Sequence, residues 1–183
     1  VFSADILAAR AELEALQERQ TALVAEDRRF SEPVRRQRRR DRLIAYLAQL
    51  RSDGRGVPLW TTTHNGVVRK DALTGAETPP VNALLIHLHV GIDAQAEPAE
   101  HLLLRKATKQ LVLDAIPAIG TETGGMDTPI TINPDTGKPW RPRFDAKTLL
   151  LEERMLQAAC YIVCAYLTGM RDCEVQAMRT SCL

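Results

Sequence analysis

The sequence predicts a mainly α-helical protein, and three observations support this. Residues 4–29, 33–52 and 146–167 repeat apolar side chains every three or four positions, which is the period of an amphipathic helix. Prolines and glycines separate these segments, as they do at helix ends. The chain of 183 residues is 45% hydrophobic and 26% charged, which is typical of a globular protein with a real core.

The first expected helix, 4–29, carries a short heptad seam in which Gln20 is the polar member. The seam consists of Ile6, Ala9, Leu13, Leu16, Gln20 and Leu23. Three heptads can pack on a neighbouring helix of the same chain or on a second chain, as in a coiled coil. Both arrangements stay open on this pattern.

The second expected helix begins at Pro33, which favours a helix start, and ends near Ser52, before Gly54. Its second half has an apolar face, and its first half is strongly basic. From residue 28 to residue 42, eight arginines stand against two acidic residues, a local balance of +6 in a chain of net charge +1. Such an asymmetry indicates a nucleic-acid-binding helix. The candidate DNA contacts on this helix are Arg35, Arg36, Arg38, Arg39, Arg40 and Arg42.

The middle of the chain is expected to mix short strands with a helix. Two strands, 58–63 and 67–70, flank His64-Asn65-Gly66, which is a hairpin turn signal. Residues 81–92 fit both a strand and a helix, and a helix is favoured because Asn82 can cap its first turn. His87 and His89 lack a third ligand nearby in the sequence, so they are interpreted as partly buried structural histidines.

A further amphipathic helix is expected from Pro98 to about Ile116, with Leu104 among its apolar residues. Residues 117–144 are rich in glycine and proline, which is typical of an interdomain connection. They hold one expected hairpin, residues 130–133 turning through 134–137. The connection has a basic end, and its candidate DNA contacts are Arg141 and Arg143.

Asp145 is expected to cap the next helix, 146–167, whose apolar side chains are typical of a core element. Gly169 ends that helix, and a last helix begins near Arg171. Cysteines occupy positions 160, 164, 173 and 182 without C-x-x-C spacing or a nearby histidine. Reduced thiols packed in a core are therefore expected, with a zinc site as the minor alternative.

No apolar run reaches the roughly 18 residues that a membrane span needs, so no membrane partner is expected. Acidic and basic residues interrupt the apolar stretch that a leader peptide requires. A cytoplasmic location is the resulting expectation, and nothing in the sequence calls for a metal or a cofactor.

The most informative segment is the helix break at Thr168-Gly169, which is followed by Met170 and Arg171. An arginine at a turn that opens a helix combines a rigid guanidinium with free backbone N–H groups, and both favour a phosphate oxygen. Glu174 lies one helical turn further on, where it can orient the arginine.

Thr168-Gly169-Met170-Arg171, with Glu174-Val175 after it, resembles the first conserved box of the catalytic domain of tyrosine recombinases, the family of phage integrases. The segment from Trp140 to Met178 is similar to actinophage-type integrases in particular. The resemblance implies that Arg171 contacts the scissile phosphate and that Glu174 supports it. Cys173 stands where the family often has a serine.

The resemblance also implies an order of parts. Residues 1–116 correspond to a helical DNA-clamping, or core-binding, region, residues 117–145 to a basic linker, and residues 146–183 to the start of an incomplete catalytic domain. The whole enzyme then cuts and rejoins double-stranded DNA through a 3′-phosphotyrosyl link, beside further recombinase protomers and without a cofactor.

In the family, the nucleophilic tyrosine and a His-x-x-Arg box follow the first arginine. The three tyrosines of this chain, 46, 161 and 166, all precede Arg171, so the chain alone is expected to be inactive. Two rivals remain: a non-catalytic helical DNA-binding or accessory protein that uses the arginine block of residues 28–42, and a structural coiled-coil partner.

Overall fold

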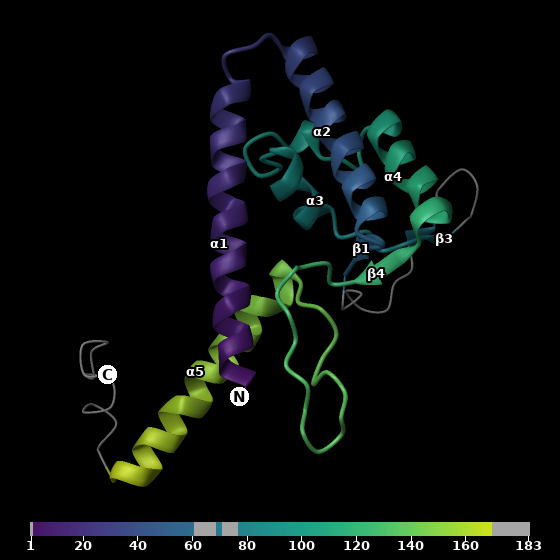
Figure 1. The fold of residues 1–183 in the computed structure, drawn as a ribbon. Coiled ribbons are helices and arrows are strands. Elements are labelled where there is room, and N and C mark those ends of the chain that lie inside the picture. Colours follow the sequence, from purple (N-terminus) through teal and green to yellow (C-terminus); the bar gives the residue numbers. More distant parts are fainter. Residues whose placement is uncertain (1, 61–68, 71–76, 170–183) are drawn as a thin grey trace.

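The computed structural model describes residues 2–60, 69–70 and 77–169 (Figure 1). In this part of the chain the fold is mainly helical, as the sequence predicts. The elements in chain order are α1 (Phe2–Asp27), α2 (Glu32–Ser52), β1 (Val57–Leu59), β2 (Arg69–Lys70), β3 (Glu77–Thr78), α3 (Ala83–Val90), the 3-10 helix η2 (Pro98–Glu100), α4 (Lys106–Ile119), β4 (Thr121–Thr123) and α5 (Ala146–Thr168).

Helices α1 and α2 form a long hairpin (Figure 1). The heptad seam of α1 packs into the chain's own core. Ile6, Ala9 and Leu13 are each no more than 8% exposed and cluster with side chains of α3 and α5. The polar seam residue, Gln20, donates a hydrogen bond of 2.6 Å to the carbonyl of Ile92. The intrachain arrangement is therefore the one that this structure adopts.

A second core lies between α2, α3 and α4. Leu43, Tyr46 and Leu50 of α2 pack with Ile86 of α3 and Val112 of α4, and each of these five side chains is at least nine-tenths buried. The helical prediction for residues 81–92 is confirmed, because the Asn82 side chain accepts from the Leu85 N–H and caps α3.

Helix α3 ends at Gly91, which adopts a left-handed conformation with φ of 76°. A Cβ atom at this position would approach the Leu23 Cβ to 2.6 Å, so glycine also allows α1 to cross close to the end of α3.

In the described residues, the strands near the expected hairpin pair with other segments of the chain. Strand β1 pairs in parallel with β4, in the register Val57↔Thr121, while β2 pairs antiparallel with β3. The expected hairpin of 58–63 with 67–70 stays a prediction, because residues 61–68, which include its turn, lie outside the described residues. The pairing of β1 with β4 cannot be read from a local sequence pattern, because 64 residues separate the partners Val57 and Thr121.

The prediction that a helix begins at Pro98 is wrong, because α4 begins later in the chain. Pro98 opens only the short η2, α4 begins at Lys106 and extends to Ile119, and Leu104 is 72% exposed. The physical reason is that side chains form hydrogen bonds with backbone N–H and C=O groups that would otherwise pair with each other in a continuous helix. His87 Nε2 accepts from the Leu102 N–H at 3.0 Å, and the Thr108 hydroxyl donates to the Leu102 carbonyl at 2.7 Å.

The segment 117–145 lies against α1 through two carboxylates of that helix. Asp5 accepts hydrogen bonds from the N–H of Thr131 at 2.7 Å and from Trp140 Nε1 at 2.8 Å. Glu12, two turns along α1, accepts from the N–H groups of Asp127 and Thr128 at 2.7 Å each. The expected hairpin within this segment is confirmed by the bridge between Ile132 and Pro139. The division into a domain, a linker and a second domain stays a prediction.

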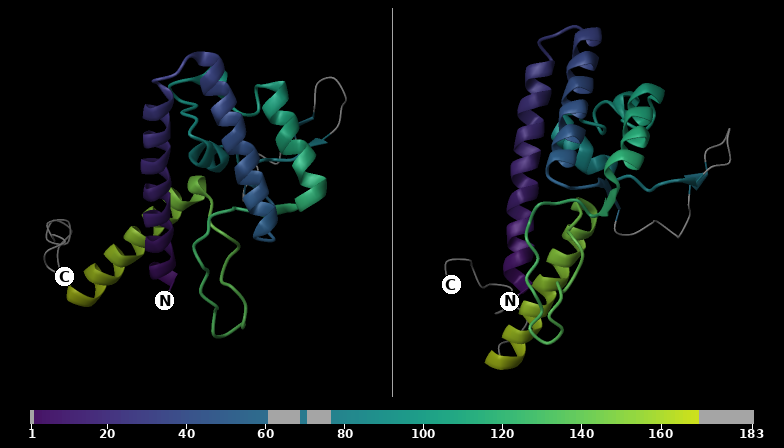
Figure 2. Two further views of the ribbon diagram at one scale, coloured as in Figure 1. Left: turned by 45° about the horizontal axis from the view of Figure 1, so that its top comes forward. Right: turned by 45° about the vertical axis from the view of Figure 1, so that its right-hand side comes forward.

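Helix α5 begins and ends as predicted, with Asp145 accepting from the N–H groups of Lys147 and Thr148, and with Gly169 in a left-handed conformation (φ 64°). Its first half packs on α1 through Leu149 and Leu156. Its second half runs past the N-terminal end of α1 and away from the body of the molecule in every view (Figure 2).

Candidate nucleic-acid interface

The arginine block lies on the first half of α2, and its inner side surrounds Asp27, a fully buried carboxylate at the end of α1. Asp27 accepts from Arg38 at 3.2 Å and from Arg42 at 3.1 Å, and Arg39 Nε lies 3.5 Å away. Burial alone would raise the pKa of Asp27, but the hydrogen bonds from Arg42 and Arg38 outweigh burial and lower that pKa below its ordinary value. Three members of the block thus neutralise one internal charge.

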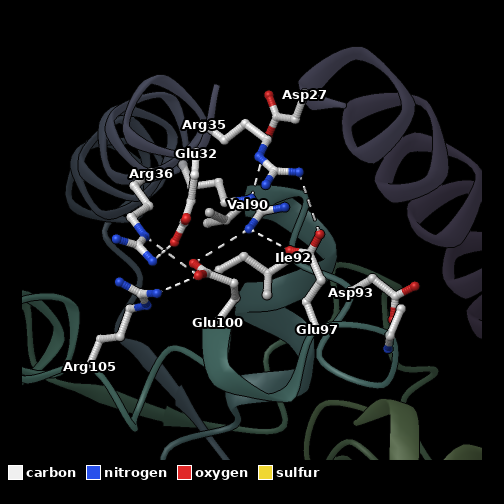
Figure 3. Close-up of polar contacts among 12 residues, drawn as sticks. Asp27, Glu32, Arg35, Arg36, Val90, Ile92, Asp93, Glu97, Glu100 and Arg105 are labelled. Atoms are coloured by element: carbon white, nitrogen blue, oxygen red, sulfur yellow. Dashed lines mark hydrogen bonds and ion pairs between the residues drawn. The ribbon is translucent and has the colours of Figure 1, made fainter. Parts of the chain in front are cut away.

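A second group of carboxylates comes from η2 and the residue before it, which lie across α2 (Figure 3). Arg39 is only 6% exposed and donates to Glu97 at 2.9 Å, with Glu100 at 3.5 Å. Arg35 forms a longer ion pair with Glu97, at 3.8 Å. Arg39 therefore has acidic residues on two sides and little surface left for DNA.

Arg36 and Arg105 reach Glu100 from different elements. Arg36 pairs with Glu32 in its own helix and lies 3.5 Å from Glu100, measured from Nε to Oε1. Arg105, the residue before α4, forms a hydrogen-bonded ion pair with the same Glu100 oxygen. Sequence analysis missed Arg105, Glu97 and Glu100. The only available signal was the acidic pair beside Pro98, and 58 residues separate Arg39 from Glu97.

Three arginines of residues 28–42 face solvent instead. Arg28 and Arg29 lie in the turn between α1 and α2, and Arg40 lies on α2 between the paired positions. All three are exposed, and no described residue makes a side-chain hydrogen bond or ion pair with them. Free guanidinium groups at an exposed end of a helical hairpin are suited to phosphate contacts.

The two arginines of the 117–145 segment are both engaged. Arg141 forms an ion pair with Glu152 of α5, and its guanidinium lies 4.0 Å from the centre of the Phe144 ring. Burial lowers the pKa of Arg141 from its ordinary value. Arg143 donates to the Met126 carbonyl at 3.1 Å, and its side chain remains 38% exposed. Of the two, Arg143 has the more exposed side chain.

A further arginine, Arg55, was not singled out by sequence analysis. It donates to Glu122 of β4 and to the Gly125 carbonyl, at 2.5 and 2.6 Å, and forms an ion pair with Asp127. These bonds hold β4 and the following loop beside β1. Its partners lie about 70 positions away in the sequence, so no local pattern could reveal this role.

The histidines have structural contacts. His87 is 2% exposed and lies edge-on to His101, with the ring centres 4.6 Å apart. Burial, assisted by His101, lowers the pKa of His87 to about 4. His89 stacks on Tyr46 at 4.4 Å. Within the described residues no group of three or more His, Cys, Asp or Glu side chains is arranged to hold a metal ion.

Helix α5 exposes most of its large apolar residues. Their exposed fractions range from 50% to 86%, and the residues are Leu150, Leu151, Met155, Ile162, Val163, Tyr166 and Leu167. Cys160 is exposed, so the expectation that it packs in a core is wrong. Arg171 and Glu174, and also Cys173 and Cys182, lie outside the described residues.

Comparison of the chain with protein-family models, curated proteins and solved structures finds no significant match. Among the helices that the structure describes, none has an apolar stretch of the length and purity that spanning a membrane requires.

Proposed function

We propose that this chain is the DNA-clamping region and the beginning of the catalytic domain of a tyrosine-type site-specific recombinase. In this proposal residues 1–116 bind DNA, residues 117–145 connect, and residues 146–183 begin the catalytic domain. The partners are double-stranded DNA and further protomers of the same kind in the cytoplasm, and the reaction uses no cofactor.

The proposal rests on two features of α5, which are its exposed apolar side chains and the position at which the helix ends. Seven large apolar side chains of one helix face solvent, and helices with so much uncovered apolar surface normally pack on something else. The helix then ends at a left-handed Gly169, two positions before Arg171. An apolar helix, a Thr-Gly break and an arginine are the parts of the family's first catalytic box, in the family's order.

The chemistry assigned to Arg171 is electrostatic. A tyrosine hydroxyl attacks the scissile phosphate, its oxygen forms the new bond to phosphorus, and the 5′-oxygen leaves. Extra negative charge develops on the phosphate oxygens, and a guanidinium stabilises it in a bidentate geometry. Glu174 orients the guanidinium. None of the chain's three tyrosines follows Arg171, so the nucleophile belongs to a part of the enzyme that this sequence does not contain.

Contacts with the DNA duplex are assigned first to Arg28, Arg29 and Arg40, the exposed members of the basic segment, and then to Arg143. Arg38, Arg39 and Arg42 hold Asp27, and Arg141 holds Glu152. These four arginines are expected to position the clamp, and their charge supports DNA binding only indirectly.

The test uses the full-length protein and a nicked suicide substrate that traps the phosphotyrosyl intermediate. Arg171→Ala is expected to remove covalent complex, because loss of one preorganised charge at the reacting centre costs about 3 kcal/mol of barrier. Arg179→Ala, eight positions further on, is the matched control and is expected to retain it. Wild-type amounts of covalent complex from Arg171→Ala would contradict the assignment.

The rival function, a non-catalytic DNA-binding protein, uses the same exposed arginines but leaves the apolar face of α5 without a purpose. The two functions make different predictions about the reading frame after residue 183. The recombinase proposal requires a His-x-x-Arg box and a later tyrosine in the same reading frame, and their absence there would favour the rival.

A further inference from the structure

We propose that Arg35, Arg36 and Arg105 form a binding site for DNA phosphate that Glu97 and Glu100 occupy while the protein is free. The inference rests on the proposed DNA-binding function and adds a particular site to it. Arg105 belongs to this site although it lies outside the basic segment of residues 28–42, at the start of α4.

The position of Glu100 marks where an anion sits. One of its carboxylate oxygens lies 3.5 Å from Arg36 Nε and pairs with Arg105, while the other lies 3.5 Å from Arg39 Nη1 (Figure 3). Two guanidinium groups from separate elements thus converge on one oxygen. A phosphodiester offers a similar pair of charged oxygens, and arginine binds both kinds of oxyanion with the same geometry.

The cluster also has an unused donor. Arg105 Nε is buried and has no hydrogen-bond partner among the described residues, although the same guanidinium already binds Glu100 through Nη2. A buried guanidinium N–H without an acceptor is costly, and a phosphate oxygen placed differently from those of Glu100 can supply the missing acceptor.

The segment that supplies the two glutamates is only weakly anchored. None of the residues of η2 is buried, so Glu100 is held mainly by its charges and by short-range turns. Leu102, two residues after Glu100, is 1% exposed and fixes the far end of the segment in the core. The carboxylates can therefore move away from α2 without disturbing the packing of the helices.

Three of the arginines whose ion pairs are to be replaced have partly exposed side chains. The side chains of Arg35, Arg36 and Arg105 are 27%, 45% and 31% exposed, and solvent screens their pairs with the glutamates. Arg39 is different, because it is buried and also lies beside Asp27, so it stays in place and keeps the site positive. Release of counterions from DNA favours the exchange of carboxylate for phosphate.

The experiment measures duplex DNA binding by fluorescence anisotropy between 50 and 200 mM salt, the range in which phosphate contacts change affinity steeply. Glu97→Gln with Glu100→Gln is expected to tighten binding about tenfold, the factor to which two surface ion pairs amount. Asp41→Asn with Asp53→Asn makes the same change in net charge on exposed positions of α2 and its cap, and is expected to give a clearly smaller gain.

A second set of variants tests the site itself. Arg35→Ala, Arg36→Ala and Arg105→Ala together are expected to flatten the log–log salt dependence by about 2.7, which is about 0.9 per lost contact. In that background the two glutamate changes are expected to give no gain. Thermal unfolding of each variant checks that the fold is retained.

The outcomes are distinct. A gain from the glutamate variant that equals the control, or one that persists without the three arginines, would overturn this inference while leaving DNA binding in place. Absence of duplex binding in every protein, including the wild type, would overturn both the inference and the proposed function.

Discussion

Helices α2 and α5 have opposite relations to their surroundings. The first half of α2 is so basic that its sequence indicates an open DNA-binding face, yet five of its arginines pair with carboxylates of the same chain. The sequence of α5 indicates a core helix, yet seven of its large apolar side chains are exposed. A residue pattern therefore identifies the chemistry of a surface but not what covers it.

The difference follows from what each helix meets in the fold. Helix α2 lies beside the end of α1 and beneath η2, which bring Asp27, Glu97 and Glu100 within reach of its arginines. Helix α5 meets α1 only along its first half, through Leu149 and Leu156. A charged side chain can pair with a single residue of opposite charge, whereas an apolar helix face is covered only by an extended complementary apolar surface.

The largest expected effect concerns Asp27, where the arginine block is structural. Asp27→Asn removes a buried carboxylate and leaves Arg38, Arg39 and Arg42 without their common partner. We expect the free energy of unfolding to fall by about 3–5 kcal/mol in urea denaturation. The neighbouring Glu26→Gln, which affects only an exposed pair with Arg38, is expected to change it by less than about 1 kcal/mol. Similar small changes for both variants would show that α2 is not anchored by Asp27.

The next effect compares the two halves of α5. Leu149 is fully buried against α1, and Leu149→Ala is expected to destabilise the chain by about 3 kcal/mol through lost burial and a cavity. Leu167 is 73% exposed, and Leu167→Ala is expected to stay within about 0.5 kcal/mol. Chemical denaturation of both variants measures the difference. A large loss for Leu167→Ala would mean that the second half of α5 packs in solution.

Because His87 is buried, the stability of the folded chain is expected to depend on pH independently of the ion pairs. The pKa of His87 is about 4 in the folded chain against an ordinary 6.5, so between these values the unfolded chain binds a proton that the folded chain does not. Stability is therefore expected to fall by up to about 3 kcal/mol as the pH drops from 6.5 to 4, with no further loss from this group below pH 4.

Stability curves of the wild type and of His87→Gln check this dependence. The variant keeps a side-chain acceptor near the Leu102 N–H but has no titrating group at this position. We expect its stability to change less than that of the wild type over the same interval, and identical pH profiles would exclude His87 as the source.

The smallest effect on stability comes from the exposed end of α5. Ile162→Glu with Leu167→Glu is expected to leave the unfolding free energy within about 0.5 kcal/mol, since both side chains are exposed. The same variant is expected to bind less of a hydrophobic dye and to self-associate less, because it interrupts the apolar face. Gln157→Glu is the control on an exposed position of the same helix. Unchanged dye binding would place the apolar surface elsewhere.

Local signals account for much of what the sequence predicted correctly. Asn82 and Asp145 cap the helices they were expected to cap, and Gly169 ends α5, because each acts within a few residues of itself. The sequence predicts the heptad seam of α1 but not the element that packs against it, since a heptad pattern does not specify the partner helix.

Interactions between distant residues account for what the sequence does not predict. The parallel pairing of β1 with β4 joins positions 64 residues apart. Helix α4 starts late because His87 binds the Leu102 N–H, a contact that periodicity cannot show. The arginines of α2 were recognised as basic, but their neutralisation depends on Glu97 and Glu100, which only the tertiary fold brings to them.

We propose that this chain binds DNA phosphates through the arginines that the fold leaves exposed, and the salt dependence of duplex binding is the measurement that checks this. Arg28→Ala, Arg29→Ala and Arg40→Ala together are expected to flatten the log–log slope by about 2.7 relative to the wild type. Arg19→Ala, Arg51→Ala and Arg154→Ala remove the same charge from exposed positions elsewhere and are expected to leave the slope unchanged. Equal slopes for the wild type and the first variant would contradict the account.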